Sequence, residues 1–417
     1  MSLPWNPRKP MSDSPKSDGW LAFQSRDFRY FFGSRFLSSL SAMMIDVGVG
    51  WMVYARTNSV FALGLVGLFA FLPNIVFMLA VGHTADRYDR RRVLLLCYGA
   101  NTVASAGLIW CAATPAIDVS FIYGMILLFG TARAFANPAS QAILPMIIPR
   151  EAFSNALAWN SSTWQVASIS GPALTGLAYL GGAELVFIIT TLFYIVCLAM
   201  IFAIKPRLAA AGREPVTWNT LTAGWRFIWA KPAILGSISV DLFAVLLGGA
   251  TALLPVYAKD IFHIDALGLG ILTCMPAVGA LACTLVIART GVGGRCGYKM
   301  FGAVAIFGLA TIGFGLSTNV WVGGFFLIVA GAVDMVSVQI RQMLVQLETP
   351  DEMRGRVSAV NSIFIGASNE LGAFESGALA AMTGPVAAVV LGGVGSIAIA
   401  AIWSKLFPTL RDRDRLV

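Results

Sequence analysis

The chain has 417 residues, of which 57% are hydrophobic and only 12% are charged, and its mean hydropathy is +0.76. A soluble domain usually carries about 25% charged residues, so this composition excludes an ordinary water-soluble fold. The formal net charge of +8 could favour nucleic acid as a partner, but the placement of the basic residues along the chain argues against that partner, as described below.

Twelve apolar runs are long enough to cross a bilayer as helices, since roughly 20 residues rising about 1.5 Å each span the hydrocarbon core. The runs are long and continuous, which excludes the short alternating strands of a membrane barrel. The sequence therefore predicts an all-α membrane protein with helices at residues 36–55, 60–82, 93–113, 119–144, 157–182, 184–204, 233–258, 266–288, 300–317, 320–346, 357–383 and 385–403.

The basic residues predict the orientation of these helices. Of the 29 lysines and arginines, all but Arg56, Arg133, Lys259 and Arg341 fall in the tails and in the loops on the same side as the amino terminus. Cytoplasmic loops of membrane proteins are enriched in these residues, so both termini are predicted to be cytoplasmic. This placement explains the basic composition without nucleic acid. The polar start of the chain is not expected to be a cleavable signal peptide, because it has no apolar core.

The two halves of the chain resemble each other. A shift of 201 residues aligns Gly171 with Gly372 and Gly176 with Gly377, and a shift of 203 does the same for the first and seventh predicted helices. A six-helix unit repeated in the same direction predicts two halves related by a pseudo-two-fold axis along the membrane normal. The predicted segments are a cytoplasmic tail at 1–27, a six-helix half at 28–205, a cytoplasmic linker at 206–231, a second six-helix half at 232–408 and a cytoplasmic tail at 409–417.

The loop after the second predicted helix, residues 82–92, contains one aspartate, Asp86, among several arginines. An anion there can cap the positive amino-terminal end of a neighbouring helix, and we interpret it as a gate contact between the two halves. The alternative is that the arginines only orient the protein and contact anionic lipid. The candidate gating residues are Gly82, Asp86, Arg87, Arg90 and Arg91.

Small residues recur at helical spacing on the fifth and eleventh predicted helices. In a membrane such faces let helices approach closely, so we interpret both as packing seams and not as substrate contacts. The predicted packing motif comprises Gly171, Pro172, Gly176, Gly372 and Gly377.

Charged residues inside the predicted spans are the sharpest functional signal. Each costs about 2.5–3.5 kcal/mol at a helix centre, so these residues are expected to face a wet cavity or one another. A carboxylate in such a place can load and release a proton. The seven residues are Asp46, Arg133, Asp241, Asp334, Arg341, Glu370 and Glu375.

We take Asp46, Arg133, Asp334, Arg341 and Glu370 as candidates for proton coupling or for the substrate cavity. Asp241 and Arg341 lie nearer helix ends and are expected to extend toward the membrane surface. The repeat aligns Arg133 with Asp334, which predicts that these two residues attract each other across a central cavity. The alternative for all of these charges is structural hydrogen bonding within the bundle.

Nothing in the sequence indicates an enzyme. The two histidines, His83 and His263, lie in or next to predicted loops, and the six cysteines have no metal-binding spacing. There is no Walker loop and no nucleophile–base pair, so no ATP, cofactor or metal is expected.

The stretch from Gly82 to Arg92 resembles the loop motif of the major facilitator superfamily, with Gly, then Asp-Arg, then a basic cluster. The stretch from Ser170 to Gly176 resembles the helix-5 motif of its exporters. The turns at 149–151 and 354–356 resemble the branch that contains the enterobactin exporter and macrolide efflux proteins. The resemblance covers residues 28 to 408. It implies that Asp86 contacts the start of the eleventh helix when the cytoplasmic side closes, and that the fourth and tenth helices line the cavity.

These features together predict a secondary transporter of the cytoplasmic membrane that acts as a monomer surrounded by lipid. It would export a small amphipathic compound, such as a drug, macrolide or siderophore, in exchange for protons by alternating access. Two alternatives stay open at this point. One is an importer or lipid flippase of the same fold, and the other is a membrane sensor or scaffold that does not transport.

Overall fold

The computed structural model describes residues 19–78, 80–81, 84, 88–114, 116–205 and 218–414. Within these ranges the chain forms helices and no strand. Nine of the described helices are long and apolar enough to cross a membrane, and the shorter apolar helix α2 (Val60–Val76) accompanies them. The chain is therefore a multi-pass membrane protein, as its composition predicts.

The helices before residue 205 form a first group that shares one apolar core, which extends from Ala22 to Ile204. A short 3₁₀ turn, η1 (Leu21–Gln24), precedes the group. Its helices are α1 (Arg26–Thr57), α2 (Val60–Val76), α4 (Arg90–Ala113), α5 (Val119–Ile147), α6 (Phe153–Tyr179) and α7 (Ala183–Ala203).

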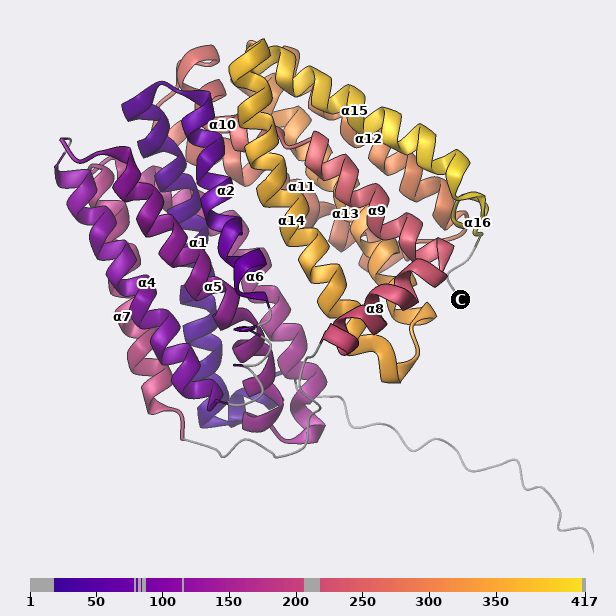
Figure 1. Cartoon of the computed structure of the whole chain (residues 1–417), viewed down its shortest axis with the longest axis horizontal. Coiled ribbons are helices and arrows are strands. Elements are labelled where there is room, and N and C mark those ends of the chain that lie inside the picture. Colours follow the sequence, from indigo (N-terminus) through magenta and orange to yellow (C-terminus); the bar gives the residue numbers. More distant parts are fainter. Residues whose placement is uncertain are drawn as a thin grey trace, which may run out of the picture.

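The helices after residue 218 form a second group. A surface helix, α8 (Trp218–Ala230), leads into it and packs beside α14 (Figure 1). The other members are α9 (Pro232–Leu247), the 3₁₀ turn η3 (Ala250–Leu253), α10 (Leu254–Val256), the π-helical turn η4 (Tyr257–Ile261), α11 (Ala266–Thr290), α12 (Cys296–Leu316), α13 (Val320–Glu348), α14 (Asp351–Thr383), α15 (Pro385–Leu406) and α16 (Pro408–Arg411).

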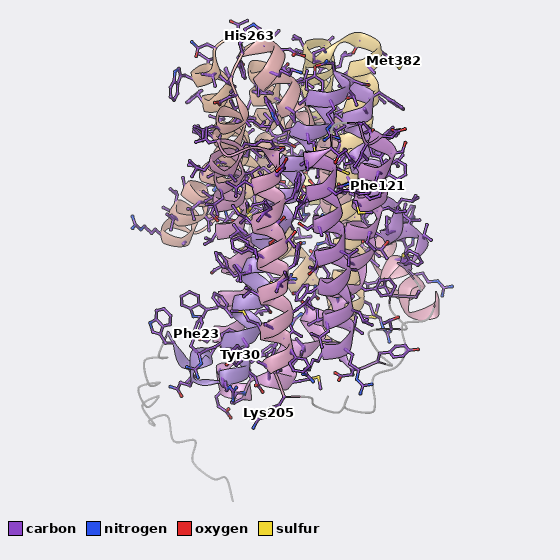
Figure 2. All side chains as sticks on the ribbon, turned by 90° about the vertical axis from the view of Figure 1, so that its left-hand side faces the viewer. Phe23, Tyr30, Phe121, Lys205, His263 and Met382 are labelled. Atoms are coloured by element: carbon purple, nitrogen blue, oxygen red, sulfur yellow. The ribbon has the colours of Figure 1, made fainter. Side chains whose placement is uncertain are left out.

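The two groups lie side by side, and α2 of the first runs along α14 of the second (Figure 1). Figure 2 shows His263 and Met382 at one end of the molecule and Phe23, Tyr30 and Lys205 at the opposite end. We call these the His263 end and the Lys205 end. Because α1 runs from the Lys205 end toward the His263 end and α5 runs back, the depth of a residue follows from its place in its helix.

Glycines bring the two groups into close contact toward the His263 end. A methyl group added at Gly64 of α2 would lie 3.0 Å from the Cα atom of Gly377 on α14. On the other side of the molecule, a methyl group at Gly176 of α6 would lie 2.9 Å from the Cα atom of Leu267 on α11. Larger side chains at these positions would push the helices apart, so the close approach depends on glycine.

Polar contacts reinforce the junction at the His263 end. The Tyr54 hydroxyl at the end of α1 donates a hydrogen bond to Asp260 of η4. Lys259 donates from Nζ to Oδ1 of Asn58 at 2.6 Å, and its ammonium group lies over the ring of Tyr54. Both contacts connect the first group to the second.

Helix α1 begins at Arg26, well before the predicted residue 36. The hydroxyl of Ser25 caps the helix by accepting from the Phe28 amide at 3.4 Å, and it donates to the carbonyl of Ile147 at 3.1 Å. Phe28 and Phe31 are almost completely buried, so the first turns pack into the core. A prediction based on apolar runs places the start of this helix too late, because polar residues interrupt the run in this segment. Arg35 therefore lies inside α1 and not before it.

Asp241 and Arg341 form an ion pair inside the second group, between α9 and α13. Their side chains are 10% and 3% exposed, respectively. The prediction that the two extend toward the membrane surface is therefore wrong. Pairing offsets the free-energy cost of burying the two charges. Either charge alone in an apolar core would stay uncompensated.

We predict that Asp241→Ala destabilises the protein strongly, because Arg341 then stays buried without its counter-ion at a cost of about 3–5 kcal/mol. The double variant with Arg341→Met removes both charges and should recover most of the loss. The measurement is the thermal unfolding midpoint of the detergent-solubilised protein. Asp412→Ala is the matched control, because Asp412 belongs to an exposed ion pair with Arg411 that should contribute little. An unchanged midpoint for Asp241→Ala would show that the pair does not stabilise the fold.

Candidate functional site

A cavity of about 580 Å³ lies between the two groups of helices. The first group contributes residues of α1, α2, α4, α5, α6 and α7 to its lining, and the second contributes residues of η3, α10, α11 and α14. A cavity of this size at the junction of two helix groups fits a drug-sized molecule.

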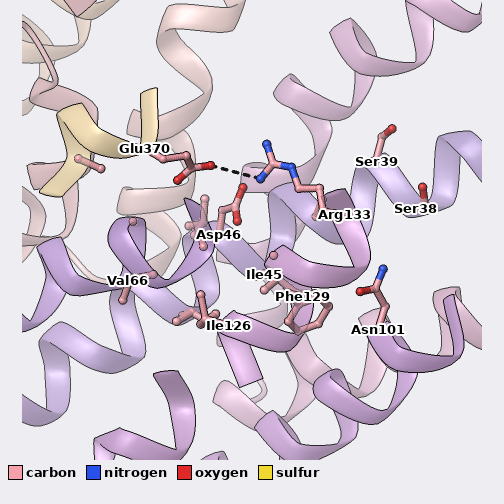
Figure 3. A pocket seen from close by; sticks show the side chains of 18 of the residues that line it. Ser38, Ser39, Ile45, Asp46, Val66, Asn101, Ile126, Phe129, Arg133 and Glu370 are labelled. Atoms are coloured by element: carbon pink, nitrogen blue, oxygen red, sulfur yellow. Dashed lines mark hydrogen bonds and ion pairs between the residues drawn. The ribbon is translucent and has the colours of Figure 1, made fainter. Parts of the chain in front are cut away.

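Three charged residues meet inside this cavity (Figure 3). Arg133 of α5 donates from Nη1 to Oε1 of Glu370 on α14 at 3.3 Å, so the pair links the first group to the second. Asp46 of α1 lies beside Arg133 and interacts with it electrostatically (Figure 3). One cation therefore faces two carboxylates, and the cluster carries one excess negative charge when both acids are ionised.

Close helix packing positions the cluster. A methyl group added at Gly67 of α2 would lie 2.8 Å from Cβ of Ala373 and 2.9 Å from the carbonyl oxygen of Glu370, so the turn of α14 that carries Glu370 lies directly against α2. A methyl group at Gly130 of α5 would meet the backbone of Ala70 on α2. Helix α2 thus contacts both the turn of α14 that carries Glu370 and the segment of α5 that precedes Arg133.

The structure brings together three of the five cavity candidates. Asp46, Arg133 and Glu370 line the cavity, whereas Asp334 and Arg341 are absent from its lining among the described residues. The predicted pairing of Arg133 with Asp334 is not present, because Arg133 contacts Glu370 instead. Alignment of the repeats places two positions at matched depth, but it does not determine which helix of the other group comes nearest.

Three of the four intramembrane charges that do not line the cavity have contacts in the described structure. Arg341 pairs with Asp241 inside the second group, which separates it from the cavity. Glu375, five residues after Glu370 on α14, is partly buried and lies 3.5 Å from the hydroxyl of Ser376. Only Glu370 of the two glutamates lines the cavity, as expected for residues on different faces of one helix.

Sequence reasoning missed a further cation, Arg35, which lines the cavity from α1. The predicted first span begins one residue later, which places Arg35 among the cytoplasmic basic residues that precede it. The serine at position 25, followed by Asp27 in the first turn, is a helix-start signal that could have placed it correctly. Asn137 and Gln141 also line the cavity. They follow Arg133 on α5 at intervals of four residues, a spacing that the sequence shows.

Three residues of the predicted gating loop, Gly82, Asp86 and Arg87, lie outside the described residues, and the gate role stays a prediction. Arg91 is described, and it donates from Nε to the carbonyl of Ile201 at 3.2 Å and from Nη2 to that of Phe202 at 2.5 Å. These carbonyls belong to the last turn of α7, where a cation is stabilising. Arg90 is buried.

The glycines of the predicted packing motif contact different neighbours. Gly171 packs against Met43 of α1 and Gly372 against Leu246 of α9, so both contacts stay within one group. Gly176 and Gly377 pack against the other group, as described above. Pro172 lies beside Gly270 of α11, with its carbonyl oxygen facing that glycine.

Comparison with known proteins agrees with this architecture. The sequence profile of the transmembrane secretion effector family of the major facilitator superfamily matches residues 17–415. The enterobactin exporter EntS of Citrobacter koseri is 26% identical over 390 residues, which cover 92% of each chain. EntS of Shigella dysenteriae serotype 1 is 26% identical over 393 residues, again with 92% of each chain covered.

Two solved structures show the same fold. A bacterial homologue of the human lysosomal transporter Spinster, in an inward-facing and unoccupied conformation, has a TM-score of 0.72 at 13% identity and covers 92% of this chain and 98% of its own. A bacterial homologue of the iron transporter ferroportin in an inward-facing state has a TM-score of 0.72 at 13% identity, with 93% and 99% covered. With the family profile matching almost the whole chain, the resemblance seen in the sequence is confirmed: this protein belongs to the transmembrane secretion effector family of the major facilitator superfamily and is a membrane transporter, not an enzyme.

Proposed function

We propose that this protein is a secondary exporter that moves a small amphipathic compound out of the cytoplasm in exchange for protons. The observation that carries the proposal is the Arg133–Glu370 ion pair, with Asp46 beside it, in a cavity between two groups of helices. Titratable groups deep in a membrane protein are costly and mark ion pathways. The similarity to enterobactin exporters supports outward transport of a compound such as a drug, macrolide or siderophore.

The architecture that we infer has twelve spans in two six-helix halves, at 28–205 and 232–408, joined by the linker at 206–231. The helices α6 and α14 complete the count. With 27 and 33 residues they are long enough to cross a bilayer, although polar residues lower their hydropathy. Both helices pack against the opposite group, which accounts for polar and small residues along them. The excess of Lys and Arg favours the Lys205 end as the cytoplasmic side.

The proposal of alternating access is supported by two kinds of contact between the halves. At the His263 end, glycines and the bonds of Tyr54 and Lys259 hold the halves together. Deeper in the molecule, Arg133 and Glu370 form an ion pair between the halves. In the proposed cycle both contacts break when the His263 end opens, and the cavity then releases its substrate to the outside.

Glu370 is the proton carrier that we favour, because it is the acid that connects the halves through Arg133. While the His263 end is open the pair is broken, and Glu370 can then take a proton from outside. When that end closes, the pair with Arg133 re-forms and favours release of the proton. Asp46 lies on the same half as Arg133 and stays beside it, so the guanidinium keeps a counter-ion when Glu370 is neutral. Opening is thereby linked to proton uptake from outside and closing to proton release into the cytoplasm.

We predict that Glu370→Gln abolishes export driven by a pH gradient, because glutamine cannot exchange a proton, while movement of the compound down its own gradient persists. The assay uses proteoliposomes with a compound identified by measuring accumulation of drugs, macrolides and siderophores in cells with and without the protein. Glu375→Gln on the same helix is the matched control and should keep its response to the gradient. Full gradient-driven export by Glu370→Gln would rule out Glu370 as the carrier.

A second prediction concerns closure at the His263 end. Gly377→Leu should prevent the close approach of α14 to α2, since even a methyl group at this position would lie 2.6 Å from the Cα atom of Gly64. We expect loss of transport and greater accessibility of the cavity from outside to an impermeant thiol reagent, measured at a cysteine introduced in place of Thr251. Gly302→Leu on α12, where an added methyl group meets nothing within 4 Å, is the matched control. Normal transport by Gly377→Leu would contradict the assigned closed contact.

A further inference from the structure

Arg35 has no counter-ion among the described residues of the cavity. It is partly exposed and lines the cavity from α1, and no described carboxylate lies within ion-pair distance of its guanidinium group. Arg35 interacts electrostatically with Tyr98 of α4, whose hydroxyl donates to Ser38 Oγ at 3.4 Å. A guanidinium group without a counter-ion inside a membrane protein is unfavourable unless a ligand or water compensates it.

The surroundings of Arg35 form one polar wall. The bond between Ser25 and Ile147 sets the antiparallel register of α1 and α5, which places Arg35 level with about residue 137. Asn137 and Gln141 line the cavity there on the same face of α5 as Arg133. Asn101 of α4 also lines the cavity, is only 6% exposed, and its Oδ1 has no hydrogen-bond partner. We call Arg35, Ser38, Asn101, Asn137 and Gln141 the polar wall.

The second group contributes mostly uncharged residues to the cavity, such as Leu254, Pro255, Leu269 and Thr273. Among its described lining residues the acid is Glu370, which already pairs with Arg133. A molecule bound at the polar wall therefore meets hydrogen-bonding groups and Arg35, and the acids of the cavity lie elsewhere.

The two cations of the cavity differ in their surroundings. Among the described lining residues, the charged groups are Arg35, Asp46, Arg133 and Glu370. Both acids lie near Arg133 and neither lies within ion-pair distance of Arg35, so the positive potential is local to Arg35. An arginine also offers two parallel N–H donors that match an oxyanion such as a carboxylate.

We propose that the cavity binds an organic anion whose acidic group contacts Arg35 and the polar wall. The inference that this anion is the exported compound rests on the proposed export function. The positive potential at the polar wall, in contrast, is a property of the protein alone and can be measured without transport.

The experiment measures this potential with charged thiol reagents at Asn137→Cys in the full-length protein in detergent. A negatively charged sulfonatoethyl methanethiosulfonate and its positively charged trimethylammonium analogue are compared, with their rates on 2-mercaptoethanol as the reference. We expect the anionic reagent to be favoured by about tenfold over the reference ratio, since one nearby cation attracts one reagent and repels the other. Arg35→Gln should return the ratio to the reference, and Arg35→Lys should keep it.

Arg29→Gln is the matched control. Arg29 lies on the same helix, is exposed and does not line the cavity, so its loss should leave the ratio unchanged. The unsubstituted protein reports background labelling of its own six cysteines. A ratio at the reference value, or one that survives Arg35→Gln, would overturn the proposal. Gln141→Cys is a second reporter on the same face, and failure of both to react would equally exclude a water-accessible anion site.

A second measurement tests the ligand class. Labelling of Asn137→Cys by neutral N-ethylmaleimide is followed in the presence of 2-naphthoate or 2-naphthamide, which differ in charge and little in shape. The carboxylate should protect more strongly, and Arg35→Gln should remove the difference. Equal protection by the two compounds, at any level, would refute the anion preference. Failure of proton-driven export with these results intact would refute the proposed function alone.

Discussion

The ion pair between Arg133 and Glu370 is the interaction on which the interpretation of this transporter depends. It is the charged contact inside the cavity that joins the first group of helices to the second. An ion pair in a wet cavity can be broken by a single proton, whereas an apolar contact of the same size cannot. In the proposed cycle, its place between the groups lets a proton change how the two groups are held together.

Other charges of the same kind have a different environment and therefore a different role. Asp241 and Arg341 pair within one group and are nearly inaccessible, so we regard them as part of the scaffold. Asp46 and Arg133 both belong to the first group and would move together. The described ion pairs of the spans are thus of two kinds: Asp241 with Arg341 stabilises one half, and Arg133 with Glu370 connects the halves. Arg35 belongs to neither kind and is available to a ligand.

Glycines decide where the two groups touch. Gly64, Gly67 and Gly377 allow α2 and α14 to approach so closely that a methyl group would collide with the facing helix. The same contact places Glu370 within reach of Arg133. Packing at the His263 end and charge pairing in the cavity are therefore parts of one interface, and a change in either is expected to alter the other.

Much of the fold could be predicted from the sequence because the bilayer imposes a simple constraint: a span must be apolar and about 20 residues long. The positions of the helices, the membrane class and the family resemblance all follow from local runs and motifs. The limits of α1 were wrong because its first turns combine polar residues with a capped, buried helix start, and apolar length alone does not detect such a start.

The site itself was decided by tertiary structure. The sequence by itself identified Asp46, Arg133 and Glu370 as costly charges inside spans, but it paired Arg133 with Asp334 and left Arg341 in the cavity. Which charges meet depends on how each helix is rotated and on which helix of the other group lies nearest, and both are determined by contacts between residues far apart in the chain. Arg35 is a cavity residue for the same reason: local composition placed it just before the first span, and only the packed helices placed it on the polar wall.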